Sequence, residues 1–227
     1  MLIIIDHKIP EAAKKKLAQF GELLELETHG ITYDAISGHP DIFFCKTLQG
    51  LIVAPNTPGR IIEKLRTLQL SFQFGKNDVD IQYPGSAIYN AAVTNNFCIH
   101  NMQITDPVIL TATESCIKID VKQGYGRCNV LALKNDHFIV SDPGIFQALQ
   151  DQNLDACLVN PSDVKLPGFR HGFFGGACGV HEDKVFITGS LSCFGDGEKI
   201  RNYLEELDYE LIELYDGPLF DGGSIMF

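Results

Sequence analysis

Apolar residues along the chain gather in short runs that end in turn-forming residues. Five such runs begin at intervals of roughly 45 residues, a spacing typical of internal structural repeats. Their length and their content of isoleucine, valine and phenylalanine predict β-strands at residues 2–6, 51–55, 97–101, 138–142 and 185–189.

A helical pattern follows these strands. Apolar residues spaced three or four apart, behind proline, threonine or aspartate start signals, predict helices at residues 10–20, 57–68, 141–149 and 196–207. The segment that begins at Thr105-Asp106-Pro107 carries the same start signal. Its body is rich in β-branched residues, which favour helices less, so we expect its helix to be short.

Two further strands complete each repeat. The second strand is predicted at residues 22–26, 70–74, 116–120, 156–159 and 210–214. A third strand is predicted at residues 41–45, 87–91, 129–133 and 177–180, and it turns back into the first strand of the next repeat. The turns at residues 94–96, 134–136 and 181–183 have hairpin chemistry. Each repeat is therefore a βαββ unit.

The two ends of the sequence indicate how the units are arranged. Residues 223–227 form a predicted third strand with no following partner, and residues 2–6 form a first strand with no preceding partner. Exposed apolar strand edges promote aggregation, so we expect these two strands to pair. The predicted fold class is α/β: a fivefold pseudosymmetric α/β propeller of five βαββ units, closed by pairing of the N- and C-terminal strands, in a single domain spanning residues 1–227. An open α/β sheet is the alternative, but it leaves the regular phase of the repeats unexplained.

Composition and charge narrow the class of partner. The chain has 227 residues, 45% of them hydrophobic, and a formal net charge of −11. Because nucleic acid binding depends on a positive field, no nucleic acid partner is expected. No apolar run is long enough for a membrane span, and the apolar start meets Asp6 too early for a signal peptide. We therefore expect a cytoplasmic protein with no membrane partner; the sequence favours no particular oligomeric state.

The seven cysteines and seven histidines do not form a recognisable metal motif. The cysteine count is odd, no pair is spaced as Cys-x-x-Cys, and most cysteines lie inside apolar runs. Without a secretion signal, this pattern is typical of reduced thiols in a core. No metal and no cofactor is expected.

Four local motifs resemble a known superfamily. They are Val121-Lys-Gln-Gly-Tyr-Gly-Arg-Cys-Asn129, Leu166-Pro-Gly-Phe169, Gly172-Phe-Phe-Gly-Gly-Ala-Cys-Gly179 and Asp221-Gly-Gly-Ser-Ile225. Together with the fivefold repeat over the whole chain, they resemble the pentein superfamily, the fold of the guanidino-group-modifying enzymes, and within it an uncharacterised bacterial family. The superfamily also contains non-enzymatic ribosome anti-association initiation factors of similar length.

The resemblance implies a central cavity and indicates which residues of this sequence line it. The enzymes attack a guanidinium carbon with a cysteine thiolate, move protons with a histidine and hold the guanidinium with carboxylates. Asp221-Gly-Gly-Ser and Gly38-His39-Pro40-Asp41 are similar to their Glu-Gly-Gly-Ser and Gly-His-x-Asp motifs. This similarity implies a general acid/base role for His39 and guanidinium contacts for Asp41 and Asp221, in a water-accessible cavity.

The nucleophile departs from the enzymes' pattern. Ser86 stands in the unit where their cysteine is expected, and the nearest cavity candidate is Cys128, one unit further along. Arg127 beside it is expected to lower the thiol pKa. Because a whole unit separates Cys128 from His39 and Asp41, classical cysteine hydrolysis or deimination is expected to be absent.

Two functions fit these residues. The first is a small-molecule protein that binds or modifies an amino-acid-like or guanidino compound, a cationic ligand, in the axial cavity, with His171, Arg127 and Ser86 as further contacts. The second is a non-catalytic interaction protein similar to the initiation-factor branch. In that case Asp41 and Asp221 are turn-forming residues and Cys128 is a core thiol.

Overall fold

The first strand of each repeat is almost entirely buried, as its apolar composition requires. In the computed structural model, which describes residues 1–227, these strands lie in five small sheets and are the central strands of the four that have three strands. They are β1 (Leu2–Asp6), β4 (Gly50–Val53), β7 (Phe97–His100), β10 (His137–Val140) and β13 (Lys184–Ile187). Each is followed by a helix: α1 (Glu11–Leu17), α3 (Gly59–Thr67), α4 (Pro107–Ala112), α6 (Pro143–Asp151) and α7 (Gly197–Glu206).

The sheets share one connectivity. The first strand pairs in parallel with the second strand of its own repeat, across the helix between them. These second strands are β2 (Glu22–Leu26), β5 (Phe72–Phe74), β8 (Ile117–Asp120), β11 (Asp155–Leu158) and β14 (Glu210–Glu213). In four sheets the third strand of the preceding repeat pairs antiparallel on the other side. These strands are β3 (Phe44–Thr47), β6 (Ala92–Val93), β9 (Val130–Ala132) and β12 (Cys178–His181).

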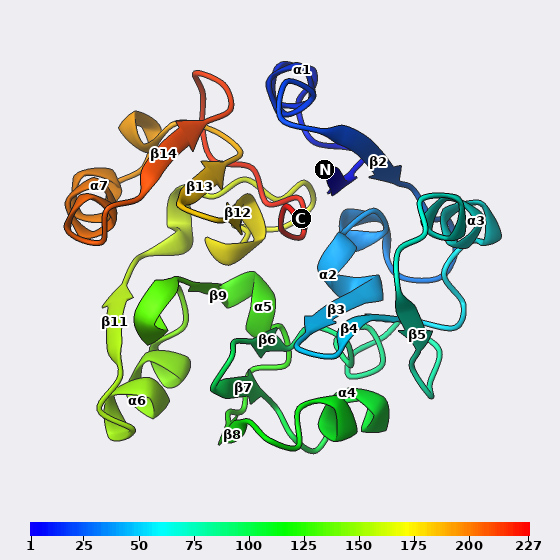
Figure 1. The fold of residues 1–227 in the computed structure, drawn as a ribbon. Helices are drawn as coiled ribbons and strands as arrows, with labels where there is room; N and C mark the ends of the chain where they lie inside the picture. The colour runs from blue at the N-terminus through cyan, green and yellow to red at the C-terminus, as the bar shows by residue number, and fades with distance from the viewer.

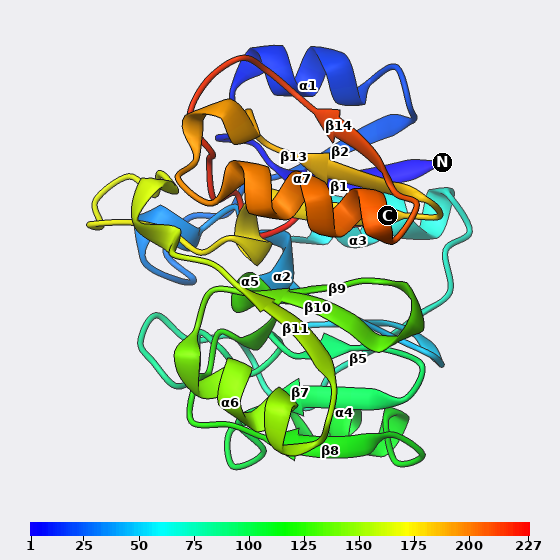
Figure 2. The same ribbon diagram turned by 90° about the vertical axis from the view of Figure 1, so that its left-hand side faces the viewer.

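Figure 1 shows the five sheets set around a common centre, with the third strands innermost and α1, α3, α4, α6 and α7 towards the outside. Edge-on, the yellow-green loop between β11 and β12 projects from one face, whereas both chain ends lie towards the other (Figure 2). The third strands therefore run along the centre of the molecule, from one face to the other.

Two of the start signals read from the sequence act as predicted, whereas Asp196 makes no capping hydrogen bond and Pro10 and Pro58 stand one residue before their helices. Asp106 caps α4 by accepting a hydrogen bond from the Val108 backbone N–H at 2.9 Å, and Asp142 caps α6 by accepting one from Ile145 at 2.8 Å. The helix with the β-branched body, α4, has only six residues. None of the helices has the length and apolarity needed to cross a membrane.

The two ends of the chain meet, as the unpaired apolar edges predicted. Ile4 and Met226 form an antiparallel bridge, in which the Ile4 N–H donates to the Met226 carbonyl at 2.8 Å and the Met226 N–H donates back at 3.1 Å. The contact is a single bridge rather than a regular strand. The cysteines are all free, and only Cys193 is exposed.

Two predicted starts of third strands are wrong, those at residues 41 and 87, whereas β9 and β12 start within one residue of the prediction. Residues 41–43 lie in a one-turn helix, α2 (Pro40–Phe43), and a second one-turn helix, α5 (Gly126–Asn129), precedes β9. Residues 87–91 form turns, and strand pairing starts only at Ala92. Pro40 fits the first turn of a helix, where its missing N–H has no partner to lose. In a strand, successive side chains would point alternately to its two faces. In these helical turns they can instead point towards the centre of the molecule.

Candidate functional site

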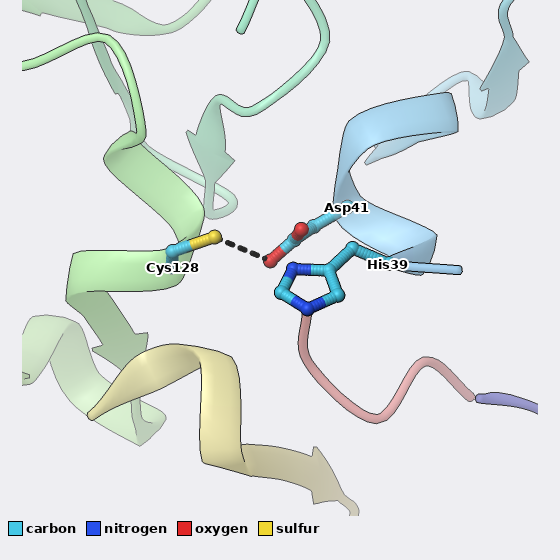
Figure 3. Close-up of side chains that lie close together, drawn as sticks. All are labelled: His39, Asp41 and Cys128. Carbon is cyan, nitrogen blue, oxygen red and sulfur yellow. Dashed lines mark hydrogen bonds between the residues drawn. The ribbon is translucent and has the colours of Figure 1, made fainter. Parts of the chain in front are cut away.

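His39, Asp41 and Cys128 lie together at the centre of the molecule. His39 and Asp41 come from the start of α2, and Cys128 comes from α5 (Figure 3). The Cys128 thiol donates a hydrogen bond to Asp41 Oδ2 at 3.0 Å, and donor atoms of all three side chains lie within 4.8 Å of one another. The expectation that an intervening unit separates Cys128 from His39 and Asp41 is wrong, because side chains of repeats that are not adjacent in the sequence meet at the centre of the molecule.

Asp41 is held by contacts from three other repeats. Ser224 Oγ donates to Asp41 Oδ2 at 2.7 Å, and the Asp41 backbone N–H donates to the Gly223 carbonyl at 3.1 Å. Asn90 donates to the Asp41 carbonyl at 3.0 Å and to Cys128 Sγ at 3.3 Å, and it accepts from the Cys128 backbone N–H at 3.1 Å. Asn90, which sequence reasoning did not assign to the site, therefore ties α2 to α5.

Asp221 lies on the other side of the His39 ring. It accepts hydrogen bonds from the backbone N–H groups of Phe173 at 2.8 Å and Gly223 at 3.0 Å, and its Oδ1 lies 3.9 Å from His39 Nδ1. The approach depends on glycine, since a Cβ at Gly176 would lie 2.0 Å from Asp221 Oδ1. This close packing explains why the chain before β12 is rich in glycine.

Asp6, the last residue of β1, is a site residue that sequence reasoning missed. Its Oδ2 lies 3.7 Å from His39 Nε2, and its Oδ1 accepts from the Lys8 backbone N–H at 2.7 Å. The signal in the sequence is a carboxylate that closes an otherwise apolar buried strand. The acidic cluster, as we call it, consists of Asp6, His39, Asp41, Cys128 and Asp221.

The acidic cluster is buried and incompletely hydrogen-bonded. Each of its five side chains is at most 3% exposed. Four buried side-chain polar atoms in the chain have no hydrogen-bond partner, and three of them are Asp6 Oδ2, His39 Nδ1 and Asp41 Oδ1. Buried polar groups are normally paired, so this concentration marks a site with unused hydrogen-bonding capacity.

Burial shifts the protonation of the acidic cluster towards neutral forms. It raises the pKa of Asp6 to about 6 and, together with the charge of Asp41, that of Asp221 to about 7. It also raises the pKa of Asp41, and it lowers that of His39 to about 3. Burial and the charges of Asp41 and Asp221 raise the pKa of the Cys128 thiol well above its usual value.

Arg127 does not activate Cys128, contrary to expectation. Its Nη1 donates to the carbonyls of Val130 at 3.0 Å and Gly175 at 3.3 Å, and its Nη2 donates to the carbonyl of Cys178 at 3.5 Å. The guanidinium therefore binds strand ends on the far side of α5. The thiol faces carboxylates instead of a cation.

Two other predicted contacts also lie apart from the acidic cluster. Ser86 Oγ bonds to the Tyr125 hydroxyl at 2.8 Å, and that hydroxyl bonds to Tyr33 at 3.2 Å. His171 Nδ1 lies 2.8 Å from the Gly172 carbonyl, and its side chain lines a different cavity beside Asp196. Neither side chain contacts a member of the acidic cluster.

The open space beside the acidic cluster is a small cavity, which only some members of the cluster line. A cavity of about 190 Å³, the entrance cavity, is lined by Asp6, Lys8, Asp34, Ala35, His39, Pro167 and Phe220. Asp41 and Asp221 do not line it, so the predicted water-accessible cavity with all three motif side chains on its wall is wrong for these two. They lie behind His39.

His39, Asp41 and Cys128 also form the one group of donor atoms in the chain close enough to hold a metal ion. Imidazole, carboxylate and thiolate are the ligands that zinc takes in proteins. The spacing of these residues in the sequence does not indicate such a site, because they come from two repeats that are not adjacent.

Solved structures define the class of fold. The chain superposes on an amidinotransferase, SxtG, from Microseira wollei with a TM-score of 0.54 and 10% identity, covering 93% of this chain and 87% of that one. For DDAH from Pseudomonas aeruginosa complexed with citrulline the TM-score is 0.56, the identity 8% and the coverage 93% and 91%. For C. jejuni agmatine deiminase the values are 0.58, 8%, 94% and 86%. These proteins belong to the pentein superfamily, and the likeness shows that this chain shares their fold.

The sequence itself defines the family. Residues 4–226 match the family described as "Family of unknown function (DUF6873)", and the chain belongs to that family. A comparison with curated proteins found no match.

Proposed function

We propose that this chain is a single closed propeller of five βαββ units that binds an amino-acid-like guanidino or amidino compound at the acidic cluster. Support for the closed ring comes from the five sheets around one centre and from the bridge between Ile4 and Met226. Support for the ligand class comes from the charge and geometry of the acidic cluster.

One observation carries the proposed ligand class: three buried carboxyl groups share a site with no lysine or arginine paired to any of them. Asp6 and Asp221 flank His39 at 3.7 and 3.9 Å, and Asp41 bonds only to hydroxyl and thiol groups through its side chain. Buried carboxylates are costly unless a cation pairs with them. A planar guanidinium or amidinium offers several N–H donors in the fork geometry that carboxylates accept.

The entrance cavity favours a ligand that also carries a carboxylate. Lys8 lines this cavity beside Asp6 and His39, and its ammonium donates to Ser37 Oγ at 2.7 Å and to the Asp34 carbonyl. An amino-acid-like ligand would place its guanidinium among the carboxylates and its own carboxylate near Lys8. The names of the structurally similar proteins, which include an agmatine deiminase and a DDAH complexed with citrulline, agree with this class.

Covalent chemistry at Cys128 is a second candidate function, favoured by its contact with Asp41. The expected absence of cysteine chemistry rested on a separation that the structure does not have. A bound guanidinium adds positive charge where Asp41 and Asp221 now hold the thiol protonated, and this charge would lower the thiol pKa. The thiol proton can then pass to Asp41 Oδ2, 3.0 Å away, as the sulfur bonds to the amidino carbon and the π electron pair of its C=N bond moves onto the nitrogen.

The alternative of a non-catalytic interaction protein has less support. An axis that only packs would be filled by apolar side chains, because buried charge costs stability unless it has a function. The acidic cluster and its unpaired atoms therefore favour a small-molecule site.

Thermal-shift measurements test the ligand class. We expect agmatine and arginine to raise the melting temperature, because they bind only the folded state, and citrulline, a neutral analogue of arginine, to raise it much less. Each measurement is repeated with EDTA, so that a contaminating metal ion is not mistaken for the ligand's effect. A shift with phosphate or simple carboxylic acids alone would contradict the proposal.

Iodoacetamide labelling followed by mass spectrometry tests the thiol. A Cys193→Ser variant removes the exposed cysteine, which otherwise reacts first. In this background we expect slow labelling of Cys128 at pH 7, and a covalent adduct on Cys128 only after incubation with a guanidino or amidino compound. Rapid labelling without ligand would show that Cys128 is already a thiolate, against the account given above.

A further inference from the structure

A second cavity lies at the centre of the molecule, on the hairpin side of the third strands. Its volume is about 240 Å³, and we call it the hairpin-side cavity. It is lined by the third strands and by residues next to them, whereas four members of the acidic cluster precede these strands and the fifth, Asp6, ends β1. The lining residues from the strands include Phe44, Val93, Ala132, Val180 and Phe227.

The charge of this cavity is opposite to that of the acidic cluster. Arg127 and Lys46 carry the only charged side chains on its wall, which also includes Phe227, the last residue of the chain. The whole chain carries a formal net charge of −11, so a wall without an aspartate or glutamate side chain is unusual for this molecule. Most other lining residues are apolar.

Arg127, which lines this cavity, has unused hydrogen-bond donors. A guanidinium has five N–H donors, and three hydrogen bonds connect that of Arg127 to the backbone carbonyls of Val130, Gly175 and Cys178. No carboxylate lies within salt-bridge distance of it; the arginine ion pairs of the chain involve Arg60 and Arg201. A partly buried guanidinium with no direct ion pair, beside an open volume, has the geometry of an anion site.

We infer that the hairpin-side cavity binds a small monocarboxylate with a compact apolar body. The planar fork of Arg127 matches a carboxylate, and the body lies against the apolar strand residues. Lys46 lies at the exposed rim, where its ammonium donates to the Phe227 carbonyl at 2.8 Å, and adds a weaker attraction. Phosphate would satisfy the charge but leave the apolar wall uncovered.

The inference goes beyond the proposed function and does not depend on it. Arg127 and Cys128 are consecutive residues of α5, yet one lines the hairpin-side cavity and the other belongs to the acidic cluster. Ser224 lines the cavity and donates to Asp41, so a single hydroxyl connects the two sites.

Fluorine NMR with 4-fluorobenzoate tests the inference on the full chain. We expect binding of 4-fluorobenzoate, displacement by hexanoate, and no binding of the neutral 4-fluorobenzamide. Arg127→Gln should weaken binding by about tenfold or more, the loss of one charge-assisted hydrogen-bonded pair. Lys46→Gln should weaken it less, because that ammonium is exposed.

Space-filling variants separate binding from any structural role of Arg127. Ala132→Leu fills the cavity while Arg127 stays in place, and it should abolish 4-fluorobenzoate binding. Ala12→Leu, on the exposed face of α1, adds the same side chain elsewhere and should leave binding unchanged. Equal binding of the benzamide, unchanged binding in Ala132→Leu, or no binding of either 4-fluorobenzoate or hexanoate to the unmodified chain would overturn the inference. Binding of phosphate in their place would also overturn it.

Discussion

The two ends of the molecular centre are built from adjacent residues but have opposite chemistry. At one end, residues just before the third strands and Asp6 at the end of β1 supply three buried carboxyl groups, a neutral histidine and a thiol. At the other end, the third strands supply an apolar wall, and Arg127 and Lys46 are the only charged side chains beside it. The difference shows that a single turn of helix such as α5 is enough to direct neighbouring side chains to two separate sites.

The two ends also differ in how much open space they contain. The acidic cluster has almost no exposed surface, and only its Asp6 and His39 line the entrance cavity, which is smaller than the hairpin-side cavity. A cation is therefore expected at one end and an anion at the other. Each prediction below alters one end, or the ring that holds both.

The largest effect is expected from removing residues 1–6. This deletion removes β1, whose Ile3 and Ile5 are fully buried, and exposes the edges of β2 and of residues 225–227. We expect no cooperative thermal transition by circular dichroism. Asp6→Asn is the control, since it keeps the strand and changes only the acidic cluster. A truncated protein with an unchanged melting temperature would contradict the closed ring.

Asp221→Asn should act on the acidic end alone. Removing one carboxylate from a charge-assisted pair is expected to weaken agmatine binding by about tenfold or more, measured by isothermal titration calorimetry. Binding of 4-fluorobenzoate should stay the same. Asp183→Asn, which removes an exposed carboxylate paired with Lys184, is the matched control. Equal agmatine affinities in the two variants would remove Asp221 from the site.

Gly176→Ala should disturb the acidic cluster through packing. The added Cβ would lie 2.0 Å from Asp221 Oδ1, so Asp221 must move. We expect a loss of about 1–3 kcal/mol in the free energy of unfolding, measured by urea denaturation, together with weaker agmatine binding. Gly59→Ala is the control, because its Cβ would meet no atom within 4 Å. Similar stabilities for both variants would show that the contact is unimportant.

The pH dependence of ligand binding should differ between the two ends of the molecular centre. Asp221 has a pKa of about 7 and Asp6 of about 6, and both must be ionised to bind a cation. Agmatine binding should therefore weaken as the pH falls from 8 to 6, approaching about a tenfold change per pH unit below the pKa of Asp221. Binding of 4-fluorobenzoate should change little over this range. An agmatine affinity that does not change between pH 8 and pH 6 would mean that neither carboxyl group takes up a proton in this range.

The repeat architecture could be predicted from sequence because each repeat carries its own local pattern. The first strand at residues 2–6 and the cap at Asp106 depend on residues close together in the chain, and both are present. The third strands predicted at residues 41–45 and 87–91 were placed too early in the sequence, because helix and strand patterns are hard to distinguish over four residues. The start of α2 at Pro40 shows this ambiguity.

The acidic cluster could be predicted only in part. Two motifs correctly suggested that His39 lies near Asp41 and Asp221, but no local pattern connects Asp6 or Asn90 with them. The contact of Cys128 with Asp41 joins residues 87 positions apart. The order of the repeats did not predict it, because the distance between units at the centre is much shorter than at the rim. The direction of the Arg127 side chain likewise depends on carbonyls from other repeats.

A crystal structure of the chain with agmatine, grown with EDTA, tests the central claim most directly. The account predicts a guanidinium that donates to Asp221 and Asp41 at about 2.7–2.9 Å, with the Cys128 sulfur facing its central carbon. It also predicts that a matched structure of Asp221→Asn lacks the ligand. An acidic cluster unchanged by saturating agmatine, with the ligand absent or bound elsewhere on the molecule, would contradict the account.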